Sequence, residues 1–347
     1  MWQSTPPADA EPILPHGRPP CLGSSSDGRP TIPAVTSSTA GFDAASTTDD
    51  VLEGVDLDGE VVLVTGASAG LGLETVRALA DRGATVVAAV RDVPKAQAAL
   101  ASAGVEVSDR VTLEEVDLAS LASVRAFTDR FAASRDRLDV LVANAGLMAC
   151  PQGTTADGFE LQFGTNHLGH FVMVNRLVPL LLDSSPSRVV VLTSAAHHIG
   201  DVDLDDPGFE TTPYNEWLAY GRSKTANAQY AVELDRRLAD RGVRAVAVHP
   251  GTVDTELVRH LDEEALAMTA KSGGTQKTVE VGAATQVWAG FVADAAEVGG
   301  RYVLDCCVAE PVDDWDPQGV RSYVVDPDRG ARLWSTSEAM VDETFSW

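Results

Sequence analysis

The sequence has few basic residues, and lysine is the scarcer of the two kinds. It holds 26 lysine and arginine residues against 51 aspartate and glutamate residues, a formal net charge of −25 over 347 residues. Binding to nucleic acid or to an anionic membrane surface requires basic patches, so we expect neither partner. The lysines are Lys95, Lys224, Lys271 and Lys277. Lys224 follows Tyr220 by four residues in an apparently helical stretch, which would place a phenol and an ammonium on one helix face.

Long apolar runs and cysteine patterns are also missing. The longest apolar candidate, FVMVNRLVPLLL, is interrupted by Asn175 and Arg176 and is too short to span a membrane. The N-terminus lacks the charged start and apolar stretch of a signal peptide. Four cysteines, Cys21, Cys150, Cys306 and Cys307, show no spacing typical of a disulfide framework or a metal site. These absences favour a cytoplasmic protein.

Residues 1–47 differ in composition from the rest of the chain. They are rich in Pro, Ser, Thr, Gly and Ala and show neither helical nor strand periodicity. Such a composition cannot offset the entropy of ordering by burial. We interpret residues 1–47 either as a disordered tail or as an overlong start-site assignment. Residues 48–347 would form one domain, which includes a substrate lid and a C-terminal extension.

Seven short apolar segments are separated mostly by segments of helical length. They are EVVLVTG (60–66), TVVAAV (85–90), RVTLEEV (110–116), LDVLVAN (138–144), SRVVVLTS (187–194), VRAVAVHP (243–250) and GGRYVLD (299–305). Strands that are apolar throughout are typical of a parallel sheet with both faces covered. We predict an α/β, doubly wound, Rossmann-like domain that binds its ligands at the carboxyl ends of the strands.

The segment TGASAGLG (65–72) joins the first predicted strand to the first predicted helix. Its glycines, Gly66, Gly70 and Gly72, have the spacing G-x3-G-x-G. Such a turn lets backbone N–H groups approach a pyrophosphate, aided by the positive end of the helix. An ordinary glycine-rich turn is the alternative, but the place after the first strand of a βαβ pattern favours a dinucleotide.

Further motifs follow the glycine loop in a fixed order. They are ANAG (143–146), NHLGHF (166–171), Ser194, YGRSK (220–224) and HPGTVDT (249–255). Over residues 55–310 this order resembles the single-domain branch of the short-chain dehydrogenases/reductases. It is most similar to the retinol-dehydrogenase-like and WW-domain-oxidoreductase-like subgroup, although no WW module is visible. The resemblance implies an NAD(P)-dependent oxidoreductase that transfers a hydride to or from a carbonyl or alcohol and needs no metal.

The same resemblance implies four catalytic residues, Asn166, Ser194, Tyr220 and Lys224. Tyr220 would be the general acid/base, with its pKa lowered by the nearby ammonium, and Lys224 would also bind the nicotinamide ribose. Ser194 would polarise the substrate carbonyl, although a serine capping a strand end is the common alternative. Asn166 would hold a water that relays protons from Lys224. An asparagine within a helix is otherwise unfavourable, which supports a function for it.

The resemblance also places the cofactor contacts. Besides Tyr220 and Lys224, they are Gly66, Ser68, Gly70, Leu71, Gly72, Arg91, Asp117, Asn144, Gly146, Val253 and Thr255. Arg91 follows the second strand, where a guanidinium suits the 2′-phosphate of NADP, and NAD stays open as an alternative. Asp117 would contact the adenine, or act as a plain helix N-cap, or both. Asn144 would line the adenine ribose and steady the central strand, with Val253 and Thr255 near the carboxamide.

The substrate is less well specified by the sequence. Residues 195–219 would form a loop over the pocket, and residues 256–274 would form the lid. Apolar lid residues would contact a lipophilic substrate or form the buried stripe of an ordinary helix, and they are Leu257, Leu261, Leu266 and Met268. Two histidine pairs, at 167 and 170 and at 197 and 198, lack zinc-helix spacing and are interpreted as structural.

Two other functions and one assembly compete with or extend this hypothesis. A non-catalytic NADP-binding sensor or scaffold would need only the glycine loop, so the complete catalytic set argues against it. A light-dependent reductase similar to the protochlorophyllide reductases would need a pocket cysteine that we cannot place. The resemblance also implies a homo-oligomer, with subunits paired through the helices that carry NHLGHF and YGRSK.

Overall fold

The computed structural model describes residues 41–253 and 276–347, and its centre is an eight-stranded sheet. The strand order is β3-β2-β1-β4-β5-β6-β7-β8, in which all neighbours are parallel except β7 and β8. The strands are β1 (Val61–Thr65), β2 (Thr85–Val90), β3 (Val111–Glu115), β4 (Val140–Ala143), β5 (Ser187–Leu192), β6 (Val243–His249), β7 (Tyr302–Leu304) and β8 (Cys307–Val308). A separate pair joins β9 (Pro311–Val312) to β10 (Val320–Arg321).

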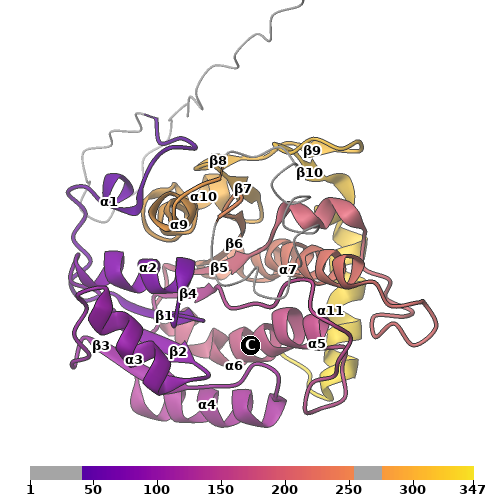
Figure 1. The fold of residues 1–347 in the computed structure, drawn as a ribbon, viewed down its shortest axis with the longest axis horizontal. Helices are drawn as coiled ribbons and strands as arrows, with labels where there is room; N and C mark the ends of the chain where they lie inside the picture. The colour runs from indigo at the N-terminus through magenta and orange to yellow at the C-terminus, as the bar shows by residue number, and fades with distance from the viewer. Residues whose placement is uncertain (1–40, 254–275) are drawn as a thin grey trace, which may run out of the picture. The chain divides into compact units, whose positions relative to one another are not determined.

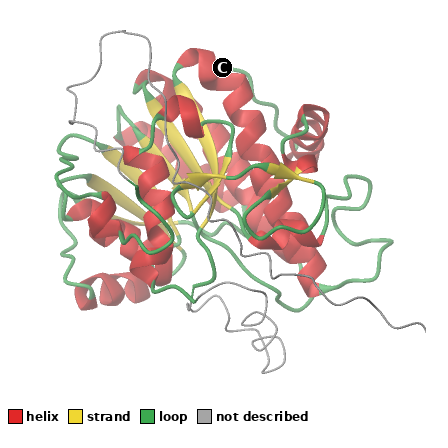
Figure 2. Cartoon of the chain, turned by 90° about the horizontal axis from the view of Figure 1, so that it is seen from above, coloured by secondary structure: helices red, strands yellow, loops and turns green. Residues whose placement is uncertain are grey.

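Helices cover both faces of this sheet (Figure 2). One layer holds α4 (Leu121–Ser134), α6 (Gly169–Asp183), α7 (Glu216–Leu238) and α11 (Pro327–Val341). The other holds α1 (Thr48–Val51), α2 (Gly70–Ala80), α3 (Val93–Ser102), α9 (Val279–Val287) and α10 (Ala295–Val298). Shorter helical segments are α5 (Leu161–Phe163), η1 (Gly164–Leu168), η2 (Ala195–Ile199), η3 (Ala239–Arg241), η5 (Trp288–Val292) and η6 (Ser322–Val324).

The apolar strands follow from this two-sided burial. In β1, Leu63 packs into the layer of α4, α6 and α7, whereas Val62 and Val64 pack into the layer of α2, α3 and α9. Because successive side chains of a strand point to opposite faces, both faces need apolar residues. The predicted doubly wound α/β fold and its seven strands are confirmed as β1 to β7. The short strands β8, β9 and β10 were not predicted.

The sheet order brings the predicted motifs to one edge. The strands β1, β4, β5 and β6 are consecutive neighbours, and all run in the same direction. Their carboxyl ends lead into the glycine loop, the ANAG segment, Ser194 and the HPGTV segment. Ligands of doubly wound folds bind at this edge, so the candidate site is assembled by the topology itself.

The C-terminal helix α11, yellow in Figure 1, packs across α7. The Trp334 ring lies 5.2 Å from the Phe171 ring of α6 and 5.8 Å from the Tyr230 ring of α7, measured between centroids. Ser337 Oγ of α11 lies 2.8 Å from His167 Nε2, in a hydrogen bond. Subunit pairing through α6 and α7 stays a prediction, and it would have to displace α11 or use another surface.

The domain begins earlier than residue 48. The compact unit starts at Phe42, whose side chain packs against the core cluster that contains Val51 and Leu52. Thr47 caps α1 by accepting a hydrogen bond from the Asp50 backbone N–H. Residues 42–47, assigned above to the tail, therefore belong to the domain, because Phe42 packs partly buried against the core and Thr47 caps a helix. Residues 1–40, Thr255 and the predicted lid at 256–274 lie outside the described residues.

This boundary gives a stability prediction. We expect a chain that starts at residue 42 to keep the melting temperature of the full chain, because the tail composition offers little to bury. Within the shorter chain, Leu52→Ala should lower the free energy of unfolding by about 2–5 kcal/mol, since Leu52 is fully buried. Urea unfolding of both proteins tests this. A large fall in melting temperature on removing residues 1–41 would show that the tail packs on the domain.

Candidate active site

A stripe of buried polar side chains runs along α7. It consists of Tyr220, Ser223, Lys224 and Asn227, which lie on one helix face and are at most 4% exposed. Lys224 Nζ donates to Leu192 O at 3.1 Å, and Asn227 Nδ2 donates to the same oxygen at 3.0 Å. These bonds fix α7 against the carboxyl end of β5.

The Lys224 ammonium is buried without an opposite charge beside it. Within the described part of the chain Lys224 forms no ion pair, and its ammonium donates one hydrogen bond, to a backbone carbonyl. Burial therefore lowers the pKa of Lys224 to about 8. An ammonium has three N–H donors, so two stay available to another group. A desolvated, unpaired cation is costly, and such groups are typical of functional sites.

Asn166 holds the neighbouring loop next to this lysine. Its Oδ1 accepts from Leu147 N at 2.7 Å, while its Nδ2 donates to Leu147 O and to Ser223 Oγ, both at 2.9 Å. A Cβ atom added to Gly146 would lie 3.3 Å from Asn166 Oδ1 and 3.4 Å from Lys224 Nζ. Glycine at position 146 thus lets the loop approach both side chains.

The local structure at Asn166 differs from the predicted long helix. The residue lies in the π-helical segment η1, between α5 and α6, and its carbonyl oxygen is 2.9 Å from His170 Nδ1. Single π turns inside α-helices are frequently found at functional sites. The side-chain amide already uses both of its N–H groups, so a water bound by this side chain would have to donate to Oδ1.

Tyr220 and Ser194 meet across the end of β5. The hydrogen bond with Ser194 lowers the pKa of Tyr220, but burial outweighs it and raises the pKa to about 12. The ring packs against Met148, Ala149 and Trp217, and Lys224 Nζ lies 5.9 Å from its centroid. The predicted lowering of the phenol pKa by Lys224 is therefore wrong for this state of the protein, because desolvation dominates.

The glycine loop has the geometry of an anion-binding turn. Gly66 has φ +73°, and a Cβ there would lie 2.8 Å from the Ala145 Cα. A Cβ on Gly72 would lie 2.5 Å from Asn144 Nδ2. No side chain caps α2 at Ala69, whereas α3, α4 and α7 are capped by Asp92, Ser120 and Asn215. The first N–H groups of α2 therefore suit a pyrophosphate. Ser68, Gly70 and Leu71 are partly exposed around them.

Thr65, which the sequence analysis did not single out, joins β1 to β4. Its Oγ1 accepts from Asn144 N at 2.9 Å and from Ala145 N at 3.0 Å, and it lies 2.9 Å from His170 Nε2. Asn144 Nδ2 in turn donates to Thr65 O at 2.8 Å. Asn144 therefore supports the end of the central strand, as expected of it. A buried polar residue ending an apolar strand is the sequence signal that points to Thr65.

The residues expected at the adenosine end are placed differently from one another. Arg91 is exposed and makes no hydrogen bond or ion pair with any described residue, so its guanidinium is available. The adjacent Asp92 carboxylate accepts from Lys95 N at 2.9 Å and is occupied as the cap of α3. Asp117 Oδ1 accepts from Ala119 N at 2.9 Å, while Ser120 caps α4. The plain helix N-cap alternative for Asp117 is therefore wrong.

At the other end of the site, Val253 and Leu71 come together. A Cβ on Gly282 of α9 would lie 2.4 Å from Val253 Cγ2 and 2.9 Å from Leu71 Cδ2. Val253 also forms a parallel bridge with Lys277. The glycine loop, the segment after β6 and α9 thus meet in one apolar contact. Gly282 was not predicted, and no sequence signal distinguishes it from other helical glycines.

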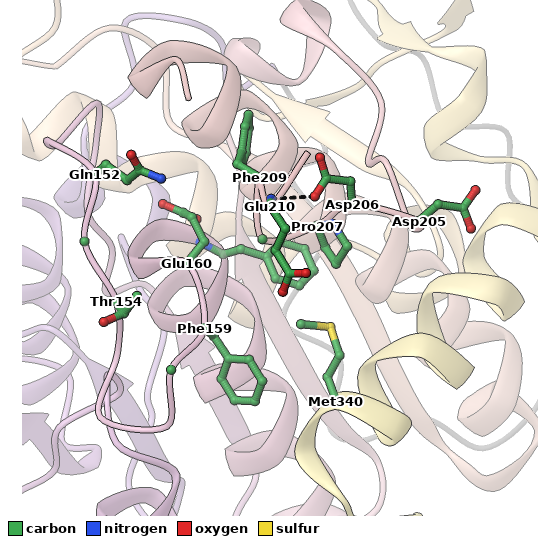
Figure 3. Close-up of a pocket in the computed structure, with 14 residues that line it drawn as sticks. Gln152, Thr154, Phe159, Glu160, Asp205, Asp206, Pro207, Phe209, Glu210 and Met340 are labelled. Atoms are coloured by element: carbon green, nitrogen blue, oxygen red, sulfur yellow. Dashed lines mark hydrogen bonds between the residues drawn. The ribbon is translucent and has the colours of Figure 1, made fainter. Parts of the chain in front are cut away.

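A cavity of about 590 Å³ lies elsewhere, between residues 152–160, residues 205–210 and Met340 (Figure 3). Asp206 Oδ1 accepts from Glu210 N at 2.6 Å at its rim. None of the predicted site residues lines it. The segment 195–219, expected over the catalytic pocket, thus contributes six of its residues to a different hollow.

The histidines are hydrogen-bonded to neighbouring groups. His170 contacts Thr65 and Asn166, and His167 contacts Ser337. Burial lowers the pKa of both rings, to about 4 for His170 and about 3 for His167. Within residues 41–253 and 276–347, no three His, Cys, Asp or Glu side chains are grouped so as to hold a metal ion.

Comparison with known proteins identifies relatives that are similar to this chain in sequence and in fold. The family model described as short chain dehydrogenase matches residues 60–266, which include every predicted site residue. Human retinol dehydrogenase 13 is 37% identical over 291 residues, covering 82% of this chain and 85% of the relative. The crystal structure of an uncharacterised Mycobacterium paratuberculosis protein has 35% identity and a TM-score of 0.68, covering 87% of this chain and 100% of that one. A complex of Pseudomonas aeruginosa RhlG with NADP has 26% identity and a TM-score of 0.58, covering 72% and 95%.

The buried ammonium gives a pH-dependent stability prediction. Its pKa falls from 10.5 to about 8 on folding, so between these values the unfolded chain binds more protons and stability rises with pH. The free energy of unfolding of wild type relative to Lys224→Met should therefore increase by roughly 2–3 kcal/mol from pH 7 to pH 10. Urea unfolding at several pH values measures this. Lys95→Met, at an exposed position, is the control, and its difference in free energy of unfolding from wild type should not change with pH. If the difference for Lys224→Met also did not change with pH, burial of the charge would be contradicted.

Proposed function

This chain belongs to the short-chain dehydrogenase/reductase family, in its retinol-dehydrogenase-like subgroup, and we propose that it transfers a hydride between NADP(H) and a lipophilic carbonyl or alcohol. Its membership makes it an NAD(P)-dependent oxidoreductase. The observation that carries the proposed hydride transfer is the buried Lys224 ammonium, which has no carboxylate partner among the described residues and lies one helical turn from Tyr220 and beside Asn166. A non-catalytic sensor would not need this costly arrangement.

In the proposal, the cofactor binds along the edge of the sheet. The N–H groups that begin α2 would hold its pyrophosphate, and Lys224 would donate its two remaining N–H groups to the nicotinamide ribose hydroxyls. Asn166 bonds hold the 146–147 loop beside the ammonium, and glycine at position 146 lets the loop come this close without a Cβ atom in the way. The bound nicotinamide supplies or accepts the hydride, and the protein supplies orientation and proton transfer.

Tyr220 delivers the proton when a carbonyl is reduced. Negative charge grows on the carbonyl oxygen as the hydride arrives, and a nearby acid must neutralise it. Burial keeps the Tyr220 phenol protonated at neutral pH, since its pKa is about 12. The Ser194 hydroxyl, hydrogen-bonded to Tyr220, polarises the same oxygen. The Lys224 charge stabilises the phenolate that remains, so Tyr220, Ser194 and Lys224 all serve the same proton transfer.

Two observations support NADP as the cofactor, and a third supports a lipophilic substrate. Arg91 is exposed and unpaired among the described residues, at the strand end where a 2′-phosphate would lie, while Asp92 is turned into the cap of α3. The similar RhlG is known in complex with NADP. Met148, Ala149 and Trp217 surround Tyr220 with apolar surface, which favours substrates without charge near the carbonyl.

The location of the protein stays a proposal. No helix in the two described ranges has the length and apolarity needed to cross a bilayer. Cell fractionation with an antibody against this chain would test the cytoplasmic location.

Removing one hydroxyl tests the proposed proton transfer. Tyr220→Phe should lower turnover by about 10²–10⁴-fold, because the ring stays but the exchangeable proton is gone. Cofactor affinity, measured by fluorescence, should stay close to that of wild type. Tyr230→Phe is the matched control on the same helix, since it removes a buried hydroxyl that bonds Asn175 instead. Near-normal turnover of Tyr220→Phe, on a panel of carbonyls and alcohols that the wild type converts, would refute the mechanism.

A second substitution tests the choice of cofactor. Arg91→Ala should weaken NADP binding by about 10-fold or more, while NAD binding changes little, because the guanidinium would contact the 2′-phosphate alone. Arg110→Ala, which removes an exposed arginine paired with Asp58, is the control. Titration of both cofactors against the three proteins gives the measurement. A wild type that prefers NAD would contradict the proposal.

A further inference from the structure

His197 follows Ser194 by three residues and forms two hydrogen bonds with its carbonyl oxygen. The residue belongs to η2 and is fully buried. Its backbone N–H donates to Ser194 O at 3.0 Å, and its Nδ1 lies 2.8 Å from the same oxygen. Ser194 follows the last residue of β5 by two positions and has an extended backbone, so no strand pairing fixes it.

The protonation of the His197 ring follows from its two backbone neighbours. Arg321 N lies 3.2 Å from Nε2, and a backbone N–H can only donate, so Nε2 must accept and carries no proton. Ser194 O can only accept, so Nδ1 must carry the proton and donate it. The opposite tautomer would place two donors face to face at one nitrogen and two acceptors at the other.

The same ring connects Ser194 to the C-terminal part of the chain. Arg321 belongs to β10, 124 residues after His197. The His197 carbonyl accepts hydrogen bonds from the Tyr323 hydroxyl and from Thr225 Oγ1 of α7. The Tyr302 ring of β7 packs 4.8 Å from the imidazole, between centroids. Besides α7, the elements β7, β10 and η6 thus contact His197, and none of these three carries a proposed catalytic residue.

We propose that His197 is a positioning residue for Ser194, fixing it through the Nδ1–H bond to its carbonyl while β10 fixes the ring through Nε2. The inference rests on the proposed function of Ser194 as the group that polarises the substrate carbonyl. A hydroxyl moved by about 1 Å from its working position can cost 10²-fold in rate. His197 itself does not contact the reacting atoms.

Two amide substitutions separate the Nδ1 bond to Ser194 O from the Nε2 bond to Arg321 N. The Tyr302 hydroxyl, 3.2 Å from Nδ1, is a further contact of the ring and would share the Nδ1 proton as an acceptor. His197→Asn can present an N–H near the position of Nδ1 and keep the bond to Ser194 O, but it cannot reach Arg321 N. His197→Gln can present its oxygen near the position of Nε2 and keep the bond from Arg321 N, but it loses the bond to Ser194. We expect kcat to fall by about 10–10²-fold further in the glutamine variant than in the asparagine variant, with unchanged cofactor affinity.

A double-mutant cycle then asks whether the loss acts through Ser194. In a Ser194→Ala background, His197→Gln should lower kcat by at most about 2-fold, since the group it positions is already absent. Equal losses of kcat in the two His197 variants, or full additivity with Ser194→Ala, would show a merely structural role and overturn the proposal.

Two measurements on the protein do not need turnover. Hydrogen exchange of residues 193–201 should be faster in His197→Gln than in His197→Asn, and equal rates would refute the positioning role. In the wild type, ¹⁵N ring shifts of His197 should show a proton on Nδ1 and none on Nε2. A proton on Nε2 instead would also refute the positioning role. If the wild type converted no carbonyl or alcohol, the proposed function would fail, while these two measurements would still decide the role of His197.

Discussion

Burial of the Lys224 ammonium is the constraint that its surroundings have to satisfy. The charge is buried without a carboxylate partner among the described residues, and the ammonium donates a hydrogen bond to Leu192 O. Polar contacts must then replace what apolar packing would do for an ordinary helix: Thr193 Oγ1 donates to the Lys224 carbonyl at 2.7 Å, and Asn227 shares the Leu192 oxygen. The carboxyl end of β5 is fixed to α7 by these bonds, so the position of Ser194, two residues later, is tied to the cost of keeping the charge buried.

Much of the fold and part of the site follow from the sequence, and the particular residues show why. The seven apolar strands were predictable because two-sided burial leaves little choice of residue, as in β1, where Leu63 and its neighbours face opposite layers. Of the polar stripe of α7, Tyr220 and Lys224 were visible at helical spacing, whereas Ser223 and Asn227 were not singled out. Tertiary bonds were not visible: Thr65 joins β1 to β4, and His197 meets Arg321 across 124 residues. The sign of the Tyr220 pKa shift also depends on burial, which one helical turn of sequence does not reveal.

The C-terminal segment from β10 to α11 has two structural roles that could not be predicted from its composition. Through α11 it covers α6 and α7, with Trp334 against Phe171 and Arg237 stacked 4.0 Å over the Trp334 ring. Through β10 and η6 it reaches the loop that follows β5, where Arg321 and Tyr323 bond to His197. The segment therefore supports α7 through α11 and the loop that holds Ser194 through β10 and η6.

The histidines near Lys224 complete the electrostatic argument. Burial lowers the pKa of His170 and of His249 to about 4, and the charge of Lys224 contributes to both shifts. At neutral pH these rings are uncharged, so they do not add a second cation beside the lysine. A single positive charge then faces the Tyr220 ring, whose own burial disfavours the phenolate. An extra buried cation would raise the cost of protonating Lys224 further, and a pKa already near 8 leaves little margin at pH 7. Neutral histidines are therefore a condition for keeping the lysine charged.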